Sequence, residues 1–370
     1  MFNIGDDISP DQAMRFALEV AKEGRGFTSP NPLVGCVVVD KDHKFLSSGA
    51  HLVYGEAHAE VNALFNVKDR SALKGSTIYV TLEPCAHKGN TGSCAHALAK
   101  LPIKKVVYGL IDPNPETAGK GVEHLRINNV EVQAFDKYKK QCEELCEHFL
   151  FHMKKGRPFV SLKMGISLDG KIALHNGESQ WITNEESRKL GRKMRAHYDA
   201  TMIGAGTLLY DNPSLDFRDT EFEGKKSNKI IIVDPKGKAA DKFSDSKIAQ
   251  KHEIKNIFVL TRPEHASNWS KNLVPVIKWE SSELGWNQAF KNLYNRGISS
   301  IYVEGGSYVF GQMLQYRLAQ KLYMFQAPKI IGAGKGWSDL YESQSLDLVP
   351  KLHNWHYITI GEDRLNIAYF

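Results

Sequence analysis

The chain has 370 residues, with 42% hydrophobic and 24% charged residues and a formal net charge of +6, which predicts a globular protein of two domains. It contains no apolar run long enough to span a membrane and no recognisable signal peptide, so we expect a cytoplasmic protein. The mild positive charge suits small anionic ligands such as phosphates and does not require nucleic acid, and an odd number of cysteines, five, argues against a disulfide framework.

Predicted strands and helices alternate through the first part of the chain. A helix is expected to begin after Ser9, where Pro10 suits the first helical position and Gln12 completes a capping box. Further helices are expected at 58–66, 93–100 and 136–153, and strands at 33–39, 76–82, 104–110 and 130–135. This alternation predicts an α/β fold with a substantially parallel sheet and a site at the strand ends.

A domain boundary is expected at 154–158, which is basic and contains Gly156 and Pro158. A second α/β domain then begins. Its helices are expected near 184–198, 283–296 and 307–318, and its strands at 159–168, 200–204, 229–233, 256–260, 274–277, 300–303 and 321–326. The segments 355–360 and 365–370 flank Gly361 and predict a closing β-hairpin.

One histidine and two cysteines in the first domain are spaced as ligands of a catalytic zinc ion. His58-Ala59-Glu60 is followed by Pro84-Cys85 and then, after residues 86–93, by Cys94, in the H-x-E…P-C pattern of zinc-dependent deaminases. Three protein ligands leave a fourth position open for a water, whose pKa zinc lowers to about 7. Glu60 would carry the proton of that water to the leaving nitrogen.

Other arrangements of metal ligands were weighed against this one. His87 could be a fourth ligand, which would close the site and make the zinc structural. A second metal site is not expected on the helix 136–153, because its two cysteines share one face and its two histidines another. These side chains, and Cys36 within an apolar strand, are expected to pack in the protein: Cys142, Cys146, His148 and His152.

Paired glycines follow a predicted strand in the second domain. The stretch 300–307 ends in Gly305-Gly306-Ser307 before a predicted helix, and such a turn lets a phosphate approach backbone N–H groups. A simple tight turn explains the same pattern. No G-x-G-x-x-G follows a strand in this domain, so a Rossmann-type dinucleotide fold is not indicated.

The first 150 residues resemble the deaminase half of the bifunctional deaminase/reductase family of riboflavin biosynthesis. The long gap between the two cysteines is that of this family and not of tRNA or cytidine deaminases. The matching stretches are Ser29-Pro30-Asn31-Pro32-Leu33-Val34-Gly35-Cys36, His58-Ala59-Glu60-Val61, Tyr79-Val80-Thr81-Leu82-Glu83-Pro84-Cys85 with His87, Cys94, and Asp112-Pro113-Asn114-Pro115.

This resemblance implies that residues 1–153 form a cytidine-deaminase-like three-layer domain that acts on a pyrimidine. The implied substrate is 2,5-diamino-6-ribosylamino-4(3H)-pyrimidinone 5′-phosphate, which loses its ring 2-amino group. Four residues are implied to surround it: Asn31, His87, Asp112 and Asn114.

The sequence departs from the family pattern inside the gap between the cysteines. Asn90 stands where the family usually has a basic residue, and Gly92-Ser93 stand where it has two prolines. We therefore expect a looser loop at 88–93, and we hypothesise that Lys88 or His87 supplies the charge that position 90 lacks.

The second half of the chain resembles the reductase half of the same family. The resemblance implies that residues 158–370 form a dihydrofolate-reductase-like domain that uses NADPH to deliver hydride to C1′ of the ribosylamino group. The matching stretches are Ser167-Leu168-Asp169-Gly170-Lys171, Gly177-Glu178-Ser179-Gln180-Trp181-Ile182-Thr183, Arg195-Ala196 with Asp199, Gly206-Thr207, Asp211-Asn212-Pro213, Arg218, Glu304-Gly305-Gly306 and Ala327-Pro328.

The match assigns two groups of residues in this half. The first would bind NADPH: Gly165, Trp181, Thr207, Asp211, Gly306, Ser307, Tyr308, Val309, Phe310, Gly311 and Gln312. The second would face the substrate: Ser179, Arg195, Leu215, Arg218 and Glu304. Arg195 and Arg218 suit a phosphate because a guanidinium offers a planar fork of donors. No acid–base residue is assigned, since hydride transfer needs mainly orientation.

We therefore expect an enzyme with one Zn²⁺ per chain, NADPH, small phosphorylated pyrimidine substrates and no nucleic-acid or membrane partner, which assembles as a homo-oligomer. One alternative is a nucleic-acid or nucleoside deaminase with a C-terminal binding domain, which would need a strongly basic face with aromatic side chains. Another is a zinc-stabilised binding module without enzymatic activity, in which Glu60 would have no role.

Overall fold

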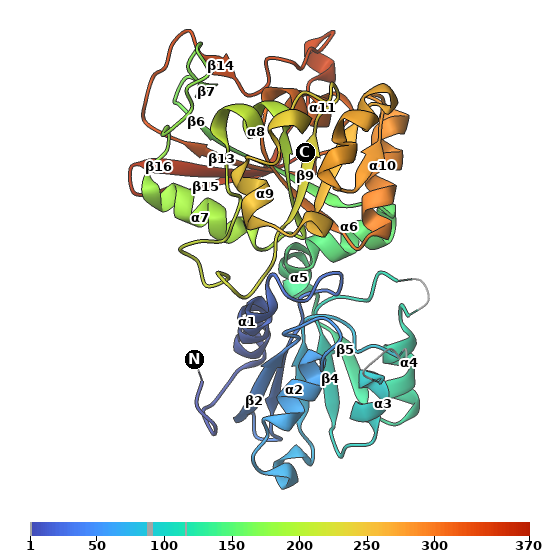
Figure 1. Cartoon of the computed structure of the whole chain (residues 1–370). Helices are drawn as coiled ribbons and strands as arrows, with labels where there is room; N and C mark the ends of the chain where they lie inside the picture. The colour runs from blue at the N-terminus through green and yellow to red at the C-terminus, as the bar shows by residue number, and fades with distance from the viewer. Residues whose placement is uncertain (1, 87–91, 115–116) are drawn as a thin grey trace. The chain divides into compact units, whose positions relative to one another are not determined.

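The computed structural model describes residues 2–86, 92–114 and 117–370, and the chain forms two compact units, 1–156 and 157–370 (Figure 1). Three residues considered above, His87, Lys88 and Asn90, lie outside the described residues. Within the part of the chain that is described, none of the helices is both long and apolar enough to cross a membrane.

A five-stranded sheet with the order β2-β1-β3-β4-β5 forms the centre of the first unit. Its strands are β1 (Gly35–Val39), β2 (Phe45–Ala50), β3 (Thr77–Val80), β4 (Lys105–Tyr108) and β5 (Glu131–Ala134). Only β3, β4 and β5 are parallel to one another, whereas β1 is antiparallel to both β2 and β3. The expectation of a substantially parallel sheet therefore holds for one half of it.

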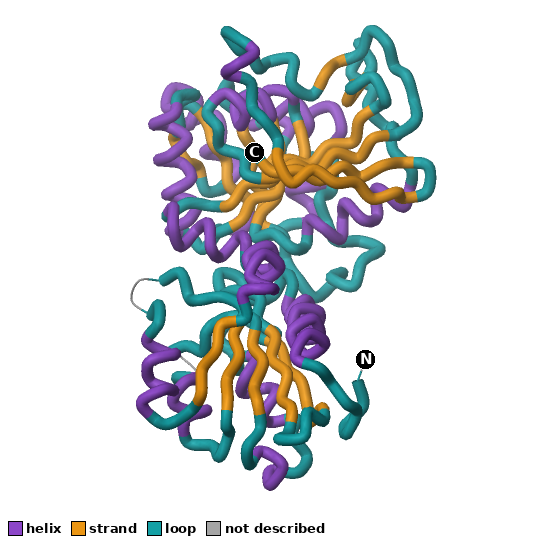
Figure 2. The backbone as a smooth tube through the Cα atoms, turned by 180° about the vertical axis from the view of Figure 1, so that it is seen from behind, coloured by secondary structure: helices purple, strands orange, loops and turns teal. Residues whose placement is uncertain are grey.

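Helices cover both faces of this sheet, which gives three layers (Figures 1 and 2). Gly35 and Gly49 lie on opposite faces, because Gly49 pairs with Cys36 and neighbouring strand residues alternate between faces. A Cβ on Gly35 would lie 2.0 Å from the carbonyl oxygen of Ala17 in α1 (Pro10–Ala21), and one on Gly49 would lie 2.3 Å from the amide of Ala63 in α2 (Ala59–Phe65). The two glycines thus allow both helices to pack directly on the sheet.

The first helix begins as predicted. The Ser9 hydroxyl accepts a hydrogen bond from the Gln12 amide at 3.3 Å, and the Ser9 amide donates to the Gln12 side chain at 2.9 Å. The helical segments of this unit are α1 (Pro10–Ala21), η1 (Lys22–Gly24), α2 (Ala59–Phe65), η2 (Arg70–Leu73), α3 (Cys94–Ala99), α4 (Lys120–Ile127), η3 (Asp136–Tyr138), α5 (Lys139–Leu145) and α6 (Glu147–Lys155).

The single helix predicted for 136–153 is interrupted at Cys146, which separates α5 from α6. The Cys146 thiol donates to the carbonyl of Leu33 at 3.3 Å, and Nε2 of His152 lies 3.0 Å from the carbonyl oxygen of Pro30. Cys142 and Cys146 are both buried. Both cysteines therefore pack in the protein, as predicted.

The second unit is built on a nine-stranded sheet with the order β11-β10-β9-β8-β12-β6-β13-β16-β15 (Figure 2). Its strands from β11 to β13 are parallel, and the hairpin of β15 and β16 adds two antiparallel strands at one edge, as predicted. The nine strands are β6 (Phe159–Ile166), β8 (Ala200–Gly204), β9 (Lys229–Val233), β10 (Ile257–Thr261), β11 (Val276–Lys278), β12 (Ser300–Gly305), β13 (Lys321–Gln326), β15 (His353–Ile360) and β16 (Asp363–Tyr369). Two short strands, β7 (Lys171–Ala173) and β14 (Lys335–Gly336), pair antiparallel in a separate two-stranded sheet.

Both faces of this sheet are buried against helices. In β9, Ile231 and Val233 belong to one buried cluster and Ile230 and Ile232 to another, so the two clusters lie on opposite faces. The helical segments are α7 (Glu185–Arg195), α8 (Ala205–Asp211), η4 (Ala240–Lys242), α9 (Lys247–Lys251), η5 (Ile254–Asn256), η6 (Pro263–Asn272), α10 (Glu283–Asn295), α11 (Ser307–Gln315) and η7 (Leu346–Leu348).

Candidate active sites

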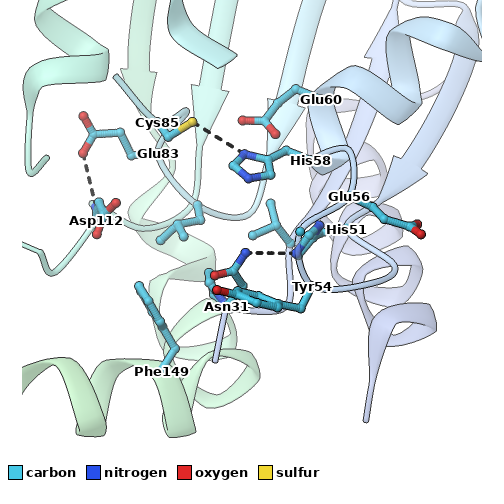
Figure 3. A pocket seen from close by; sticks show the side chains of 14 residues that line it. Asn31, His51, Tyr54, Glu56, His58, Glu60, Glu83, Cys85, Asp112 and Phe149 are labelled. Atoms are coloured by element: carbon cyan, nitrogen blue, oxygen red, sulfur yellow. Dashed lines mark hydrogen bonds between the residues drawn. The ribbon is translucent and has the colours of Figure 1, made fainter. Parts of the chain in front are cut away.

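The structure brings the three predicted metal ligands, His58, Cys85 and Cys94, together in the first unit; Figure 3 shows His58 and Cys85. Nδ1 of His58 lies 3.5 Å from Sγ of Cys85 and 3.3 Å from Sγ of Cys94. All three ligand atoms lie within 4.8 Å of one another, and this is the one such group of His, Cys and acidic side chains among the described residues. One nitrogen and two sulfurs at this spacing fit a tetrahedral zinc ion with an open fourth position.

Backbone geometry fixes each of these ligands. His58 is the N-cap residue of α2, Cys85 follows the end of β3, and Cys94 is the first residue of α3. The Cys94 amide donates to Sγ of Cys85 at 3.4 Å, and the Ser93 hydroxyl donates to the carbonyl oxygen of Cys85 at 2.8 Å. The hydrogen bond with Cys94, and then the imidazole of His58, lower the pKa of Cys85, which favours the thiolate that zinc requires.

Glu60 lies in the first turn of α2, beside His58 and Cys85 in Figure 3. Its side chain is buried. Burial, and then the neighbouring Cys85, raise the pKa of Glu60 to about 7. A carboxyl group with a pKa close to neutral can both take up and release a proton, which is what a general acid–base group must do.

A cavity of about 320 Å³ opens next to these residues and contains Asn31 and Asp112 in its wall. His51, which also lines the cavity and is buried, is not among the residues predicted from the sequence. Nδ1 of His51 lies 3.1 Å from the carbonyl oxygen of Ala57, so this nitrogen must be the donor. Nε2 then accepts from the Asn31 amide group at 3.2 Å, which leaves the Asn31 side-chain oxygen available to the cavity (Figure 3).

The neutral form of His51 is favoured because burial lowers its pKa. Its ring also packs edge-on against the ring of His58, with centroids 5.3 Å apart. No pattern in the sequence marks His51, since its role depends on contacts that form only when the end of β2 meets α2. Asp112, by contrast, was predicted, and its carboxylate accepts a hydrogen bond from the amide of Asn114 at 2.9 Å.

In the second unit, the predicted phosphate turn lies between β12 and α11. Gly306 has a φ of +89°, which favours glycine. A Cβ on Gly305 would lie 3.0 Å from Oγ1 of Thr207. Because Gly305 and Gly306 have no side chains, space remains beside Thr207 and the start of α11. Backbone N–H groups at a helix start suit a dinucleotide phosphate, and this part of the predicted NADPH site fits its ligand.

Other residues predicted for NADPH have different environments. Val309, Phe310 and Gly311 are buried in α11, and the Gln312 side chain accepts a hydrogen bond from the Trp286 indole at 3.2 Å. The Tyr308 hydroxyl donates to the Ser281 hydroxyl at 3.3 Å. These side chains are engaged within the protein, so the backbone at Gly306 and Ser307 is the part of α11 best placed for a phosphate.

Near the start of the second unit, Gly165 faces Thr183 closely, because a Cβ on Gly165 would lie 3.2 Å from the Thr183 methyl group. Trp181 is 59% exposed, which leaves its ring accessible to a cofactor. The Ser179 hydroxyl donates to the Asp211 carboxylate at 2.8 Å. Burial raises the pKa of Asp211.

Arg195 and Glu304 form a buried ion pair between α7 and β12. The guanidinium binds both carboxylate oxygens and also donates to the carbonyl oxygen of Asp216 at 2.5 Å. Lys163 of β6, which was not predicted, lies 3.4 Å from the same carboxylate. The structure thus places Arg195 against Glu304, where much of its donor capacity is already used.

Arg218 is more open than Arg195. It donates to the Ser214 hydroxyl at 2.5 Å and pairs with Asp216 at 2.6 Å. Leu215 lies in the same segment, is buried, and has a φ of +49°. Arg195 with Glu304 and Arg218 with Leu215 therefore form two groups joined through Asp216, which contacts both arginines. Ser179, the fifth predicted substrate residue, bonds instead to Asp211.

Comparisons with known proteins agree with these two sites. A family model described as the RibD C-terminal domain matches residues 158–365, and one described as the cytidine and deoxycytidylate deaminase zinc-binding region matches residues 8–110. The riboflavin biosynthesis protein RibD of Bacillus amyloliquefaciens is 36% identical over 95% of this chain and 93% of its own length. This chain belongs to the RibD family.

Further RibD proteins support the assignment. That of Escherichia coli K12 is 34% identical over 86% of this chain and 88% of its own length. The solved structure of Acinetobacter baumannii RibD has a TM-score of 0.83 at 31% identity and covers 97% of this chain and 98% of its own. A Thermotoga maritima diaminohydroxyphosphoribosylaminopyrimidine deaminase/5-amino-6-(5-phosphoribosylamino)uracil reductase has a TM-score of 0.82 at 35% identity, covering 96% and 97%.

Membership of the RibD family confirms several predictions. The protein is a bifunctional deaminase and reductase of riboflavin biosynthesis, with a cytidine-deaminase-like N-terminal domain and a dihydrofolate-reductase-like C-terminal domain. Zinc and NADPH are its cofactors. The alternatives of a nucleic-acid deaminase and of a non-enzymatic zinc module are not supported.

Proposed function

We propose that this RibD enzyme first removes the ring 2-amino group of 2,5-diamino-6-ribosylamino-4(3H)-pyrimidinone 5′-phosphate as ammonia. It then reduces the ribosyl group of the product, 5-amino-6-(5-phosphoribosylamino)uracil, to ribityl with NADPH. The observation that carries the first step is the group of His58, Cys85 and Cys94. Of these, His58 and Cys85 line the same cavity as the buried Glu60. The second step rests on the reductase domain at 158–365.

For deamination, a zinc ion held by Nδ1 of His58 and the two thiolates would supply a water activated at neutral pH. Glu60 takes up a proton on a carboxylate oxygen and delivers it to the amino nitrogen, which leaves as ammonia. Asn31, oriented by His51, presents its oxygen to a donor on the pyrimidine ring. Asp112 and Asn114 are proposed as further substrate contacts, as are His87 and Lys88 outside the described residues.

For reduction, the chain is proposed to orient two ligands. The turn at Gly306 and Ser307, with Thr207, would hold a phosphate of NADPH, while Gly165, Trp181 and Asp211 would contact the rest of the cofactor. Arg218 would bind the substrate phosphate, and Leu215 and Ser179 are proposed as further substrate contacts. Because Arg195 is paired with Glu304, we propose that it orients that carboxylate toward the ribityl chain in addition to any contact with phosphate.

We also propose that the chain forms a homo-oligomer in the cytoplasm, without a nucleic-acid partner. The edge strand β15 is exposed along nearly its whole length, with Trp355 72% and Tyr357 61% exposed, and such an edge can pair with a second copy. All five cysteines are free thiols, as is usual in a reducing compartment. Trp355→Lys should reduce the mass measured by analytical ultracentrifugation, whereas an unchanged mass would exclude this interface.

The proposed reactions can be followed separately with one protein. The zinc-loaded chain is incubated with the diaminopyrimidinone phosphate, and ammonia is measured before NADPH is added and its absorbance followed. Glu60→Gln should lower ammonia release by about 10²–10⁴-fold while reduction of the separately supplied uracil intermediate continues. Ammonia release that survives Glu60→Gln at the wild-type rate would contradict the proposed deamination.

A further inference from the structure

Glu83 is a buried carboxylate that the proposed chemistry does not use. It lies two residues before the metal ligand Cys85 and is only 4% exposed. Its Oε2 accepts hydrogen bonds from the backbone amides of Asp112 at 3.2 Å and Gly119 at 3.0 Å. Both amides belong to residues between the end of β4 and the start of α4, and Gly119 directly precedes the helix.

The other oxygen of Glu83 binds the first turn of α4. Its Oε1 accepts from the amides of Gly121 and Val122, each at 3.1 Å. A Cβ on Gly121 would lie 1.9 Å from the carbonyl oxygen of Pro84 and 3.2 Å from Oε1 of Glu83. The helix can therefore approach the segment before Cys85 this closely only because residue 121 is glycine.

Four N–H donors stabilise this buried negative charge, together with the positive end of the α4 dipole. Two donors to each oxygen use most of the acceptor capacity of a carboxylate. Glu83 also faces Asp112 across the wall of the cavity (Figure 3). Its oxygens are thus committed to the protein backbone, which argues for a positioning role and against direct contact with substrate.

We propose that Glu83 is a positioning residue that fixes the loop carrying Asp112 and Asn114 at a set distance from the Cys85 segment. The Asn114 amide donates to the Asp112 carboxylate at 2.9 Å, so holding the Asp112 backbone also orders Asn114. This inference deepens the proposed deaminase function and rests on it. One side chain thus holds the backbone of Asp112 beside the segment that carries Cys85.

The first test is Glu83→Gln in the full zinc-loaded chain. The amide group keeps the size of the side chain but offers one acceptor oxygen, and its NH₂ group faces backbone donors. We expect the deaminase KM to rise by about 10- to 100-fold, with kcat changed much less and zinc per chain unchanged. Glu123→Gln, on the exposed side of α4, is the matched control and should leave KM at the wild-type value.

Hydrogen exchange supplies a readout that does not depend on activity. In the wild-type protein, the amides of Asp112, Gly119, Gly121 and Val122 should exchange slowly, and Glu83→Gln should accelerate these four while leaving β3 unchanged. The reductase rate of the same sample serves as a control for folding. Glu83→Asp keeps the charge on a shorter side chain and should show an intermediate KM if Glu83→Gln fails to fold.

Three results would overturn the proposal. An unchanged KM in Glu83→Gln would show that the loop needs no such tether. Loss of zinc together with kcat would show that Glu83 acts on Cys85 alone. Fast exchange of the Asp112 and Gly119 amides in the wild-type protein would show that the loop is not held. If wild-type protein released no ammonia, the proposed deamination would fail, and exchange alone would still decide the role of Glu83.

Discussion

Ser93 shows how one side chain shapes the metal centre. The resemblance led us to expect a looser loop at 88–93, because Gly92-Ser93 replace two prolines. The described end of this loop is instead held by hydrogen bonds. Ser93 is buried, and its hydroxyl donates to the carbonyl oxygen of Cys85 at 2.8 Å. The same hydroxyl oxygen accepts a hydrogen bond from the amide of His96 at 3.3 Å. Ser93 therefore caps α3 and joins the backbones of both cysteine ligands.

Ser93→Ala should loosen zinc binding beyond its effect on stability. Loss of an N-cap costs about 0.5–2 kcal/mol, and Cys94 would also lose its fixed position relative to Cys85. We expect faster zinc transfer to a chromophoric chelator. Ser9→Ala removes the N-cap of α1, away from the metal ligands, and should lower stability without changing zinc transfer. Equal zinc transfer in the two variants would argue against a role of Ser93 at the metal centre.

At the scale of elements, local patterns predicted most strands but not their directions. The apolar runs of β3, β4 and β9 mark buried strands, whereas β2 (Phe45–Ala50) is rich in serine and glycine and was not predicted. The antiparallel direction of β1 depends on the short turn that joins it to β2, where the Asp40 amide donates to the Lys44 carbonyl at 2.9 Å. The antiparallel pairing of β1 with β3 joins residues far apart in the sequence, and such pairing leaves no periodic signal in the local sequence.

The same limit applies within the sites. His58, Glu60, Cys85 and Cys94 carry their chemistry in residue type and spacing, so the sequence identifies them. His51 and Glu83 act through hydrogen bonds to Asn31 and to backbone amides, and nothing in the local sequence distinguishes such a side chain from any other. The break between α5 and α6 at Cys146 was missed for a similar reason, since the Cys146 thiol bonds to Leu33, far away in sequence.

Asp169 connects the turn between β6 and β7 to a distant loop and should make stability depend on pH. It accepts from the Ser167 hydroxyl at 2.5 Å and from the amides of Ile331 and Gly332 at 3.1 and 2.7 Å. The Ser167 hydroxyl, followed by these two amides, lowers the pKa of Asp169 to about 2. Because the folded-state pKa is depressed, the stabilisation is present above about pH 4 and is lost as the pH falls toward 2.

Asp169→Asn should therefore lower the urea midpoint of the second unit at neutral pH, and the difference from wild type should shrink as the pH falls below about 4. Tryptophan fluorescence reports this unit, because all six tryptophans lie within residues 157–370. The exposed Asp245→Asn controls for the loss of one negative charge. A difference between Asp169→Asn and wild type that stays constant down to pH 2 would rule out the charged form of Asp169 as its cause.

For the whole molecule, two separate cores predict two separable unfolding transitions. The core of the first unit is built around its five-stranded sheet, and the two clusters of the second unit pack on the faces of its own sheet. A ligand stabilises only the state that it binds, by about 4 kcal/mol when its concentration is 1,000 times its Kd. Zinc is bound in the first unit and NADPH in the second, so each ligand should shift a different transition.

Removal of zinc by a chelator should therefore lower the melting temperature of one step in the far-ultraviolet circular dichroism of the full chain. The tryptophan fluorescence transition should stay in place, because the first unit contains no tryptophan. NADPH should raise the fluorescence transition and leave the zinc-sensitive step unchanged. If chelation instead lowered the melting temperature of the fluorescence transition as much as that of the dichroism step, that result would contradict the prediction. It would show that the two units unfold cooperatively and that zinc stabilises the reductase domain as well as the deaminase domain.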